Sequence, residues 1–71
     1  MNFELKENKL IISLVGRIDS NTSSDVENDI TKIINDNSFE QLVLDFENVE
    51  FLSSAGLRVI LRLKKKYNSL S

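Results

Sequence analysis

The chain has 71 residues, with 9 Lys and Arg, 11 Asp and Glu, no His, no Cys and a net charge of −2. The length allows one small domain, and the absent residue types exclude disulfides, thiolate nucleophiles and the usual general base and zinc ligand. No apolar run approaches the ~18 residues of a membrane-spanning helix, and the start lacks the features of a signal peptide. We therefore expect a cytoplasmic protein with no metal, no cofactor and no membrane contact.

The charge is unevenly distributed. Residues 1–50 hold all 11 acids and four bases (−11 + 4 = −7), and the remaining residues carry five bases and no acid, +5. Basic segments can bind nucleic acid or membranes, but cations also favour the C-terminal end of a helix dipole. The acidic body and the lack of interleaved aromatic residues favour a solvated helix face, so we expect no direct nucleic-acid binding.

The first half predicts two strands. Residues 3–7 alternate in polarity like an edge strand, and Glu7-Asn8-Lys9 forms a polar break of hairpin length without the Asn-Gly signature. Residues 10–15 are nearly all apolar, which predicts a central strand covered on both faces. Gly16 ends this strand as a bend or bulge.

A run of capping residues, 17–24, then precedes a helix. Ser24 and Glu27 fit a capping box, although Asn21 or Thr22 also fits as the start. The helix has one apolar stripe at i, i+4, i+7 and i+8, made of Val26, Ile30, Ile33 and Ile34.

The second half predicts a strand over residues 39–46, a short loop and a helix over residues 54–67. In this helix we expect a core-facing set and an outer cationic set. The core-facing residues are Leu57, Ile60, Leu61 and Tyr67, and the outer ones are Arg58, Arg62 and Lys65. Strands alternating with helices predict an α/β fold: an antiparallel hairpin and a third strand paired in parallel after a crossover.

The junction before the second helix contains Ser53 and Ser54. A serine there can cap the helix with its side-chain oxygen, or it can carry a phosphate stabilised by the helix N-terminus. The residues alone leave both roles open. Asp45 has no partner base and the two glycines form no phosphate loop, so the chain is not expected to be an enzyme.

The stretch Leu42 to Leu61, with Ser-Ser-Ala-Gly-Leu at its centre, resembles the signature of STAS domains, specifically bacterial anti-sigma factor antagonists. Residues 14–19 and the Thr-containing helix start are similar to the family's second strand and first helix. The resemblance implies a small mixed sheet with helices packed on it. It also implies a partner-switching phosphoprotein in transcription regulation.

In that family, the unphosphorylated antagonist binds a serine-kinase anti-sigma factor and frees the sigma factor. Phosphorylation breaks this protein–protein interaction and a PP2C-type phosphatase restores it. By resemblance, Ser54 is the phosphoacceptor. The partner-binding residues implied are Asp19, Thr22, Ser53, Ser54, Ala55, Gly56 and Arg58.

Two differences from the family pattern leave alternatives. Many members have Asp before the acceptor, where this chain has Ser53, so Ser53 is the alternative site. The family continues past this helix, so residues 1–71 are expected to form a single, incomplete domain, truncated after its second helix, that self-associates. The other hypotheses are a STAS scaffold or sensor module without phosphorylation and a truncated, non-functional fragment.

Overall fold

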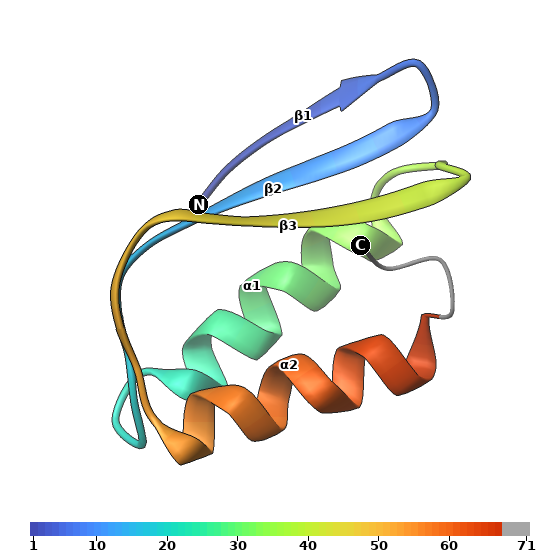
Figure 1. The fold of residues 1–71 in the computed structure, drawn as a ribbon. Coiled ribbons are helices and arrows are strands. Elements are labelled where there is room, and N and C mark those ends of the chain that lie inside the picture. Colours follow the sequence, from blue (N-terminus) through green and yellow to red (C-terminus); the bar gives the residue numbers. More distant parts are fainter. Residues whose placement is uncertain (68–71) are drawn as a thin grey trace.

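The computed structural model describes residues 1–67, in which three strands form one sheet and two helices pack on it. In chain order the elements are β1 (Asn2–Lys6), β2 (Lys9–Ile18), α1 (Ser23–Asn35), β3 (Gln41–Leu52) and α2 (Ser54–Lys66). Both helices lie on the same side of the sheet (Figure 1). The predicted α/β class, with a small mixed sheet and helices packed on it, is confirmed.

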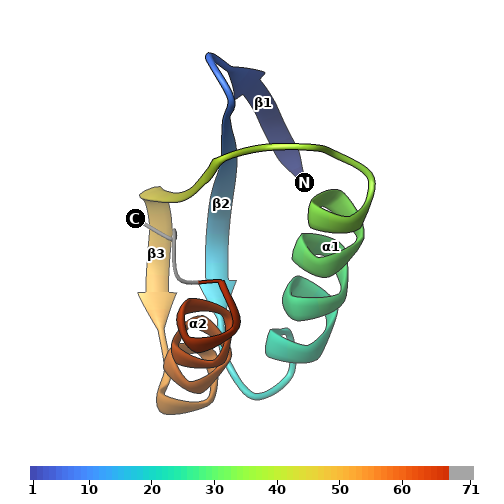
Figure 2. The same cartoon turned by 90° about the vertical axis from the view of Figure 1, so that its right-hand side faces the viewer.

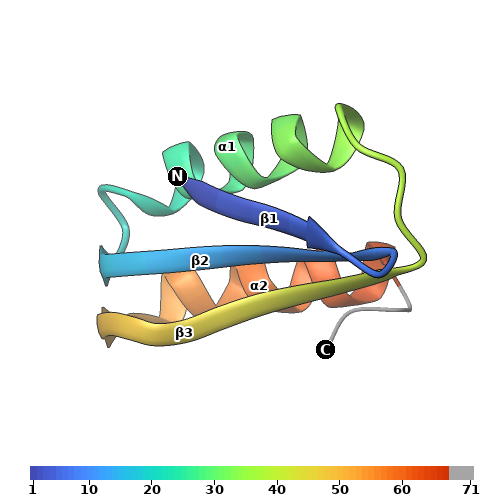
Figure 3. The same cartoon turned by 90° about the horizontal axis from the view of Figure 1, so that it is seen from above.

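The strand order is β1-β2-β3, with β2 in the centre. β1 and β2 are antiparallel and β2 and β3 are parallel, as predicted. The hairpin turn consists of Glu7 and Asn8, with φ of 52° and 66°. Positive φ at both central residues is the mark of a primed two-residue turn, formed here without the usual glycine. Figure 3 shows β1, β2 and β3 side by side from above.

The core lies between the sheet and the two helices. Its buried apolar side chains come from all elements except β1: Leu10, Ile12, Leu14, Ile18, Ile30, Ile34, Leu42, Leu44, Val59 and Leu63. Buried and less buried residues alternate along β2, because one face of the strand packs against the helices and the other does not. Val15, on the uncovered face, is 66% exposed. The prediction that this strand is covered on both faces was therefore wrong. Figure 2 shows the sheet and the two helices at right angles to the view of Figure 1.

β2 and β3 are longer than the sequence predicted. β2 continues through Gly16, which has a φ of 76°, and ends at Ile18. The register with β3 is irregular on both sides of this region, so Gly16 lies in a bulged segment rather than at a strand end. β3 likewise continues to Leu52, and the expected loop over residues 47–52 is strand. β1 begins and ends one residue earlier than predicted.

α1 begins without the predicted capping box. Its N-cap position is Thr22, one of the two alternative starts, and the Thr22 side chain makes no cap hydrogen bond. The box pairing Ser24 with Glu27 was wrong because the Glu27 carboxylate accepts hydrogen bonds from Arg62 of α2, at 2.9 and 3.2 Å. These bonds lower the pKa of Glu27. The apolar stripe is confirmed, with Ile30 and Ile34 buried.

α2 presents a different face to the core from the one predicted. Val59 and Leu63 are buried, whereas Leu57 and Leu61 are 47% and 56% exposed. The prediction that these two leucines face the core was wrong, while Ile60 and Tyr67 do pack against it. The outer position of the cationic set is confirmed. Neither helix in residues 1–67 is long and apolar enough to cross a membrane.

Candidate functional site

The candidate site lies where the C-terminal ends of β2 and β3 meet. Because these strands are parallel, both chains leave the sheet at the same edge. Ile18 pairs with Leu52 in the register, and the Ser53 N–H donates to the Ile18 carbonyl oxygen at 2.9 Å. This contact joins the β2–α1 loop to the start of α2, so segments more than 30 residues apart in the sequence form one surface.

Ser53 is the N-cap residue of α2. Its backbone is extended, with φ −82° and ψ 173°, and its Oγ accepts a hydrogen bond from the Gly56 N–H at 3.2 Å. The Ser53 carbonyl also accepts the first helical hydrogen bond, from the Leu57 N–H at 2.8 Å. Ser53 is half-buried. Its side chain therefore satisfies one of the N–H groups that a helix start leaves unpaired.

Ser54 is the first residue of α2 and has a different environment. It is exposed, and within residues 1–67 its hydroxyl makes no hydrogen bond. A group added to this oxygen would replace solvent rather than a structural contact. The sequence left a capping role and an acceptor role open for a serine at this junction. In the structure Ser53 caps the helix, and Ser54 has an exposed hydroxyl without a hydrogen bond in residues 1–67.

Gly56 allows α2 to approach the end of β2 closely. It is buried, and a Cβ at this position would lie 2.7 Å from the Ile18 carbonyl oxygen and 2.8 Å from side-chain atoms of Ile18 and Leu52. The nearest of these atoms is backbone and cannot rotate away. A residue without Cβ is therefore needed here for contact rather than for backbone freedom, and it holds the start of α2 against the sheet.

Asp19 and Thr22 tie the β2–α1 loop together. Asp19 Oδ1 accepts hydrogen bonds from the N–H groups of Asn21 at 2.9 Å and Thr22 at 3.3 Å. The Thr22 hydroxyl accepts from the Asp19 N–H and donates to the Arg17 carbonyl, both at 3.0 Å. An aspartate that bonds to backbone two and three residues ahead forms a local turn. Both side chains therefore fix the shape of the loop.

Arg17 and Phe51 belong to the same edge and were not identified from the sequence. The Arg17 guanidinium carbon lies 4.5 Å from the centre of the Phe51 ring, and Arg17 Nε is 3.8 Å from Asp19 Oδ2. Phe51 is 43% exposed. The missed signal was the register, because it places Arg17 directly opposite Phe51. An exposed aromatic ring covered by a cation is a typical component of a binding surface.

The two remaining residues implied by the resemblance lie on α2. Ala55 is half-buried beside Ser54, and Arg58 is exposed four residues after Ser54. Side chains four residues apart lie on the same face of a helix, and each is tilted toward the helix N-terminus, so the Arg58 side chain is tilted toward Ser54. The first turn of α2 contains no acidic residue. An anion on Ser54 would therefore meet the positive helix end and the Arg58 side chain, without an acid on its own turn.

Within the described part of the chain, no group of three or more His, Cys, Asp or Glu residues is placed to hold a metal ion. Asp45, in the first half of β3, accepts a hydrogen bond from the Glu47 N–H at 2.9 Å. The serines, the loop and the Arg17–Phe51 pair offer surface shape, hydrogen bonding and charge.

Comparison with known proteins identifies a family and a curated relative. The family described as STAS domain matches residues 1–71. An anti-sigma F factor antagonist of Paenibacillus polymyxa is 37% identical over 59 residues, which cover 83% of this chain and 50% of that protein. The matched region thus spans half the length of this curated relative.

Proposed function

Because the chain belongs to the STAS domain family, we propose that it is an anti-sigma factor antagonist controlled by phosphorylation of Ser54. In this proposal the unphosphorylated chain binds an anti-sigma factor that is itself a serine kinase, and the bound sigma factor is released. Phosphorylation ends the capture, and a PP2C-type phosphatase restores it. The chain acts in the cytoplasm as a binding protein and catalyses no reaction.

The observation that carries this proposal is the division of roles between the two serines. Ser53 Oγ is engaged with the Gly56 N–H, while Ser54 is exposed at the first position of α2. A kinase needs access to a hydroxyl that can be modified without breaking the fold. Ser54 offers such a hydroxyl, and modification of Ser53 would remove a helix cap. This favours Ser54 over the alternative acceptor.

The proposed switch works through charge at the docking surface. A phosphate adds about −1.5 to −2 charges near neutral pH. The N-terminus of α2 favours an anion by ~0.3–1 kcal/mol at an exposed position, and Arg58 at i+4 adds an ion pair. The phosphorylated chain should therefore stay folded. Binding is lost because the partner must then cover a dianion that it cannot solvate.

The surrounding residues supply the rest of the proposed surface. Asp19 and Thr22 hold the β2–α1 loop in a fixed shape beside the helix start. Arg17 and Phe51 extend the same surface with an exposed ring and a cation. A preordered surface of this kind loses little conformational entropy on docking. We therefore assign these four residues, with Ser53 to Gly56 and Arg58, to the interface.

We also propose that copies of the chain associate. β3 pairs only with β2 in residues 1–67, which leaves its other side as an edge, and Leu57 and Leu61 on α2 are about half exposed. An unpaired edge and exposed leucines favour self-association. The nearby cations oppose it, so association should strengthen with added salt.

The test is phosphorylation by an anti-sigma F factor, the target that the relative's name states. The wild type, Ser53→Ala and Ser54→Ala are incubated with this kinase and radiolabelled ATP. The proposal requires label on the wild type and on Ser53→Ala but not on Ser54→Ala. Label that persists on Ser54→Ala and disappears from Ser53→Ala would assign the acceptor to Ser53.

A binding measurement with the anti-sigma factor then distinguishes the phosphorylation switch from the scaffold hypothesis. Unmodified wild type and Ser54→Ala should both bind the anti-sigma factor, and the phosphorylated wild type should bind at least about tenfold more weakly than the unmodified wild type, a change of ~1.4 kcal/mol. Equal binding of the modified and unmodified chains would favour a STAS scaffold or sensor module. No binding by a correctly folded chain would favour the non-functional fragment.

A further inference from the structure

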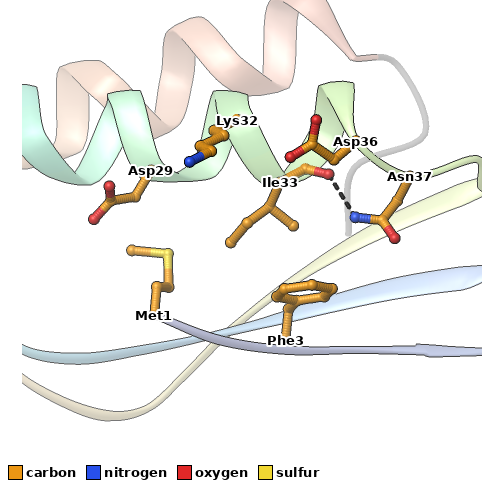
Figure 4. Close-up of a pocket in the computed structure, with 7 residues that line it drawn as sticks. All are labelled: Met1, Phe3, Asp29, Lys32, Ile33, Asp36 and Asn37. Atoms are coloured by element: carbon orange, nitrogen blue, oxygen red, sulfur yellow. Dashed lines mark hydrogen bonds between the residues drawn. The ribbon is translucent and has the colours of Figure 1, made fainter.

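A groove of about 280 Å³ lies between β1 and the C-terminal half of α1, away from the serine site. Figure 4 shows the side chains that line it. Its apolar floor is formed by Met1 and Phe3, which are 47% and 46% exposed, and by the half-buried Ile33 of α1. Such exposed apolar groups at the edge of a sheet are typical of an unfilled binding surface.

The backbone of β1 provides the second feature of the groove. The hairpin closes at the pair Lys6 and Lys9, which exchange both backbone hydrogen bonds across a two-residue turn. Bonded and non-bonded pairs alternate along an antiparallel ladder. The N–H and C=O groups of Phe3 and Leu5 therefore point away from β2, and in residues 1–67 no strand pairs with that side of β1.

Charge indicates what kind of segment fits the groove. At the rim of the groove, Asp29 of α1 and Asp36 at the C-cap of α1 are exposed, against one cation, Lys32. The Asn37 side chain is already engaged, since its Nδ2 donates to the Ile33 carbonyl at 2.8 Å. The charged side chains of the rim are therefore two carboxylates and one ammonium group, a net charge of −1, on the part of the chain that has a net charge of −7. A basic ligand complements this surface, and an anionic membrane does not.

We propose that this groove binds an extended basic segment of a partner protein, which adds a strand to the free edge of β1. Strand addition takes its affinity from backbone hydrogen bonds and its specificity from alternate side chains. One apolar side chain of the segment packs between Phe3 and Ile33, and a cation on each side of it pairs with Asp29 and Asp36.

The spacing of the two aspartates sets the sequence pattern of the segment. Asp36 lies seven positions after Asp29, which is about 10.5 Å along a helix. In a strand, residues i and i+4 lie on one face about 13 Å apart. The flexible stems of two lysines span this small difference. The pattern is therefore Lys-x-Leu-x-Lys, in which all three side chains face α1.

A second copy of this chain is a poorer occupant. Antiparallel pairing of two β1 strands would bring Asp29 and Asp36 of one copy near the same groups of the other, and like charges oppose such a contact. Copies that do associate through β1 should lose that association when β1 is blocked. The test below includes this outcome.

The probe is the labelled peptide acetyl-Thr-Lys-Thr-Leu-Thr-Lys-Thr-amide, titrated with the full chain and followed by fluorescence anisotropy. The double substitution Asp29→Lys and Asp36→Lys should weaken binding by about tenfold or more, since four units of charge change at close range. The matched control is Glu47→Lys with Glu50→Lys, the same charge change at exposed positions of β3. The control should bind within about threefold of the wild type.

Backbone pairing is tested with two N-methylated forms of the probe. One carries methyl groups on alternate amides and the other carries them on the remaining amides. Strand addition requires that one form loses binding and the other keeps it, because only every second N–H of an added strand faces β1. Circular dichroism of each protein variant confirms that it is folded.

Four results would overturn the proposal. These are no saturable binding up to about 1 mM peptide, equal weakening by the two charge-reversed variants, equal binding of both N-methylated forms, and a dimer in sedimentation that the probe dissociates. The last result would assign the groove to a second copy. Ser54→Glu should bind the probe like the wild type, so failure here is distinguishable from failure of the phosphorylation switch.

Discussion

Replacing each serine of the pair separately tests the division of roles at the start of α2. Ser53→Ala removes the oxygen that accepts the Gly56 N–H at 3.2 Å. Gly56 is buried, so water cannot readily replace this partner. Loss of a serine N-cap costs about 0.5–2 kcal/mol, and the buried donor places the expected cost in the upper half of that range, at ~1–2 kcal/mol.

Ser54→Ala is the matched control, because it makes the same chemical change one residue away. The Ser54 hydroxyl has no hydrogen bond in residues 1–67 and the residue is exposed. A surface substitution without contacts changes stability by less than about 0.5 kcal/mol. The two variants should therefore differ clearly, although their compositions are identical.

Thermal and urea unfolding measure the difference. For a domain of this size, 1 kcal/mol shifts the Tm by about 4–8 °C, so Ser53→Ala should melt at least that much below the wild type. All samples need the same protein concentration, because association raises the apparent stability. If Ser54→Ala is destabilised as much as Ser53→Ala, or if Ser53→Ala melts like the wild type, the assignment of cap and acceptor is wrong.

Three further predictions concern other contacts. Gly56→Ala should destabilise the fold by about 1–3 kcal/mol in urea unfolding, because its Cβ would lie 2.7 Å from a backbone oxygen; unchanged stability would mean that α2 is free to shift. Glu27→Gln should have a lower Tm than the wild type at pH 7, where the wild-type Glu27 is ionised and paired with Arg62. At a pH below the lowered pKa of Glu27, the wild type is protonated and loses this ion pair, so the two proteins should have similar Tm values. Leu57→Lys with Leu61→Lys should leave the Tm of the dilute chain nearly unchanged and abolish self-association in sedimentation, and a large loss of Tm would show that these leucines belong to the core.

Local patterns predicted most of the fold. The period of the apolar residues identified α1, and Ile30 and Ile34 are buried as that period requires. A hairpin followed by a helix and a third strand implied one antiparallel and one parallel pairing, and both are present. The serine pair was located at the correct helix start because capping residues before an apolar stripe mark that boundary. The helix and its start depend on neighbours within a few residues, and the two pairing directions follow from the order of the elements along the chain.

Individual contacts and the exact register between distant residues were not predicted. The capping box at Ser24 failed because Glu27 is bonded to Arg62, 35 residues away. β3 was placed too short because four of its last six residues pair with the bulged end of β2, and no local pattern reveals that pairing. Arg17 and Phe51 were missed for the same reason, since their contact exists only in this register.

The orientation of α2 shows how one such contact decides the rest. The helix has two possible apolar stripes, one with Leu57 and Leu61 and one with Val59 and Leu63, and their side chains are of similar hydrophobicity. Gly56 distinguishes them, because the only position without a Cβ must face the nearest backbone, which is the Ile18 carbonyl. Val59 and Leu63 lie three and seven residues after Gly56, on the same side of the helix, and they are buried. The same close approach turns Leu57 and Leu61 outward and presents Ser54 to solvent, so the glycine that packs the helix also exposes the proposed switch.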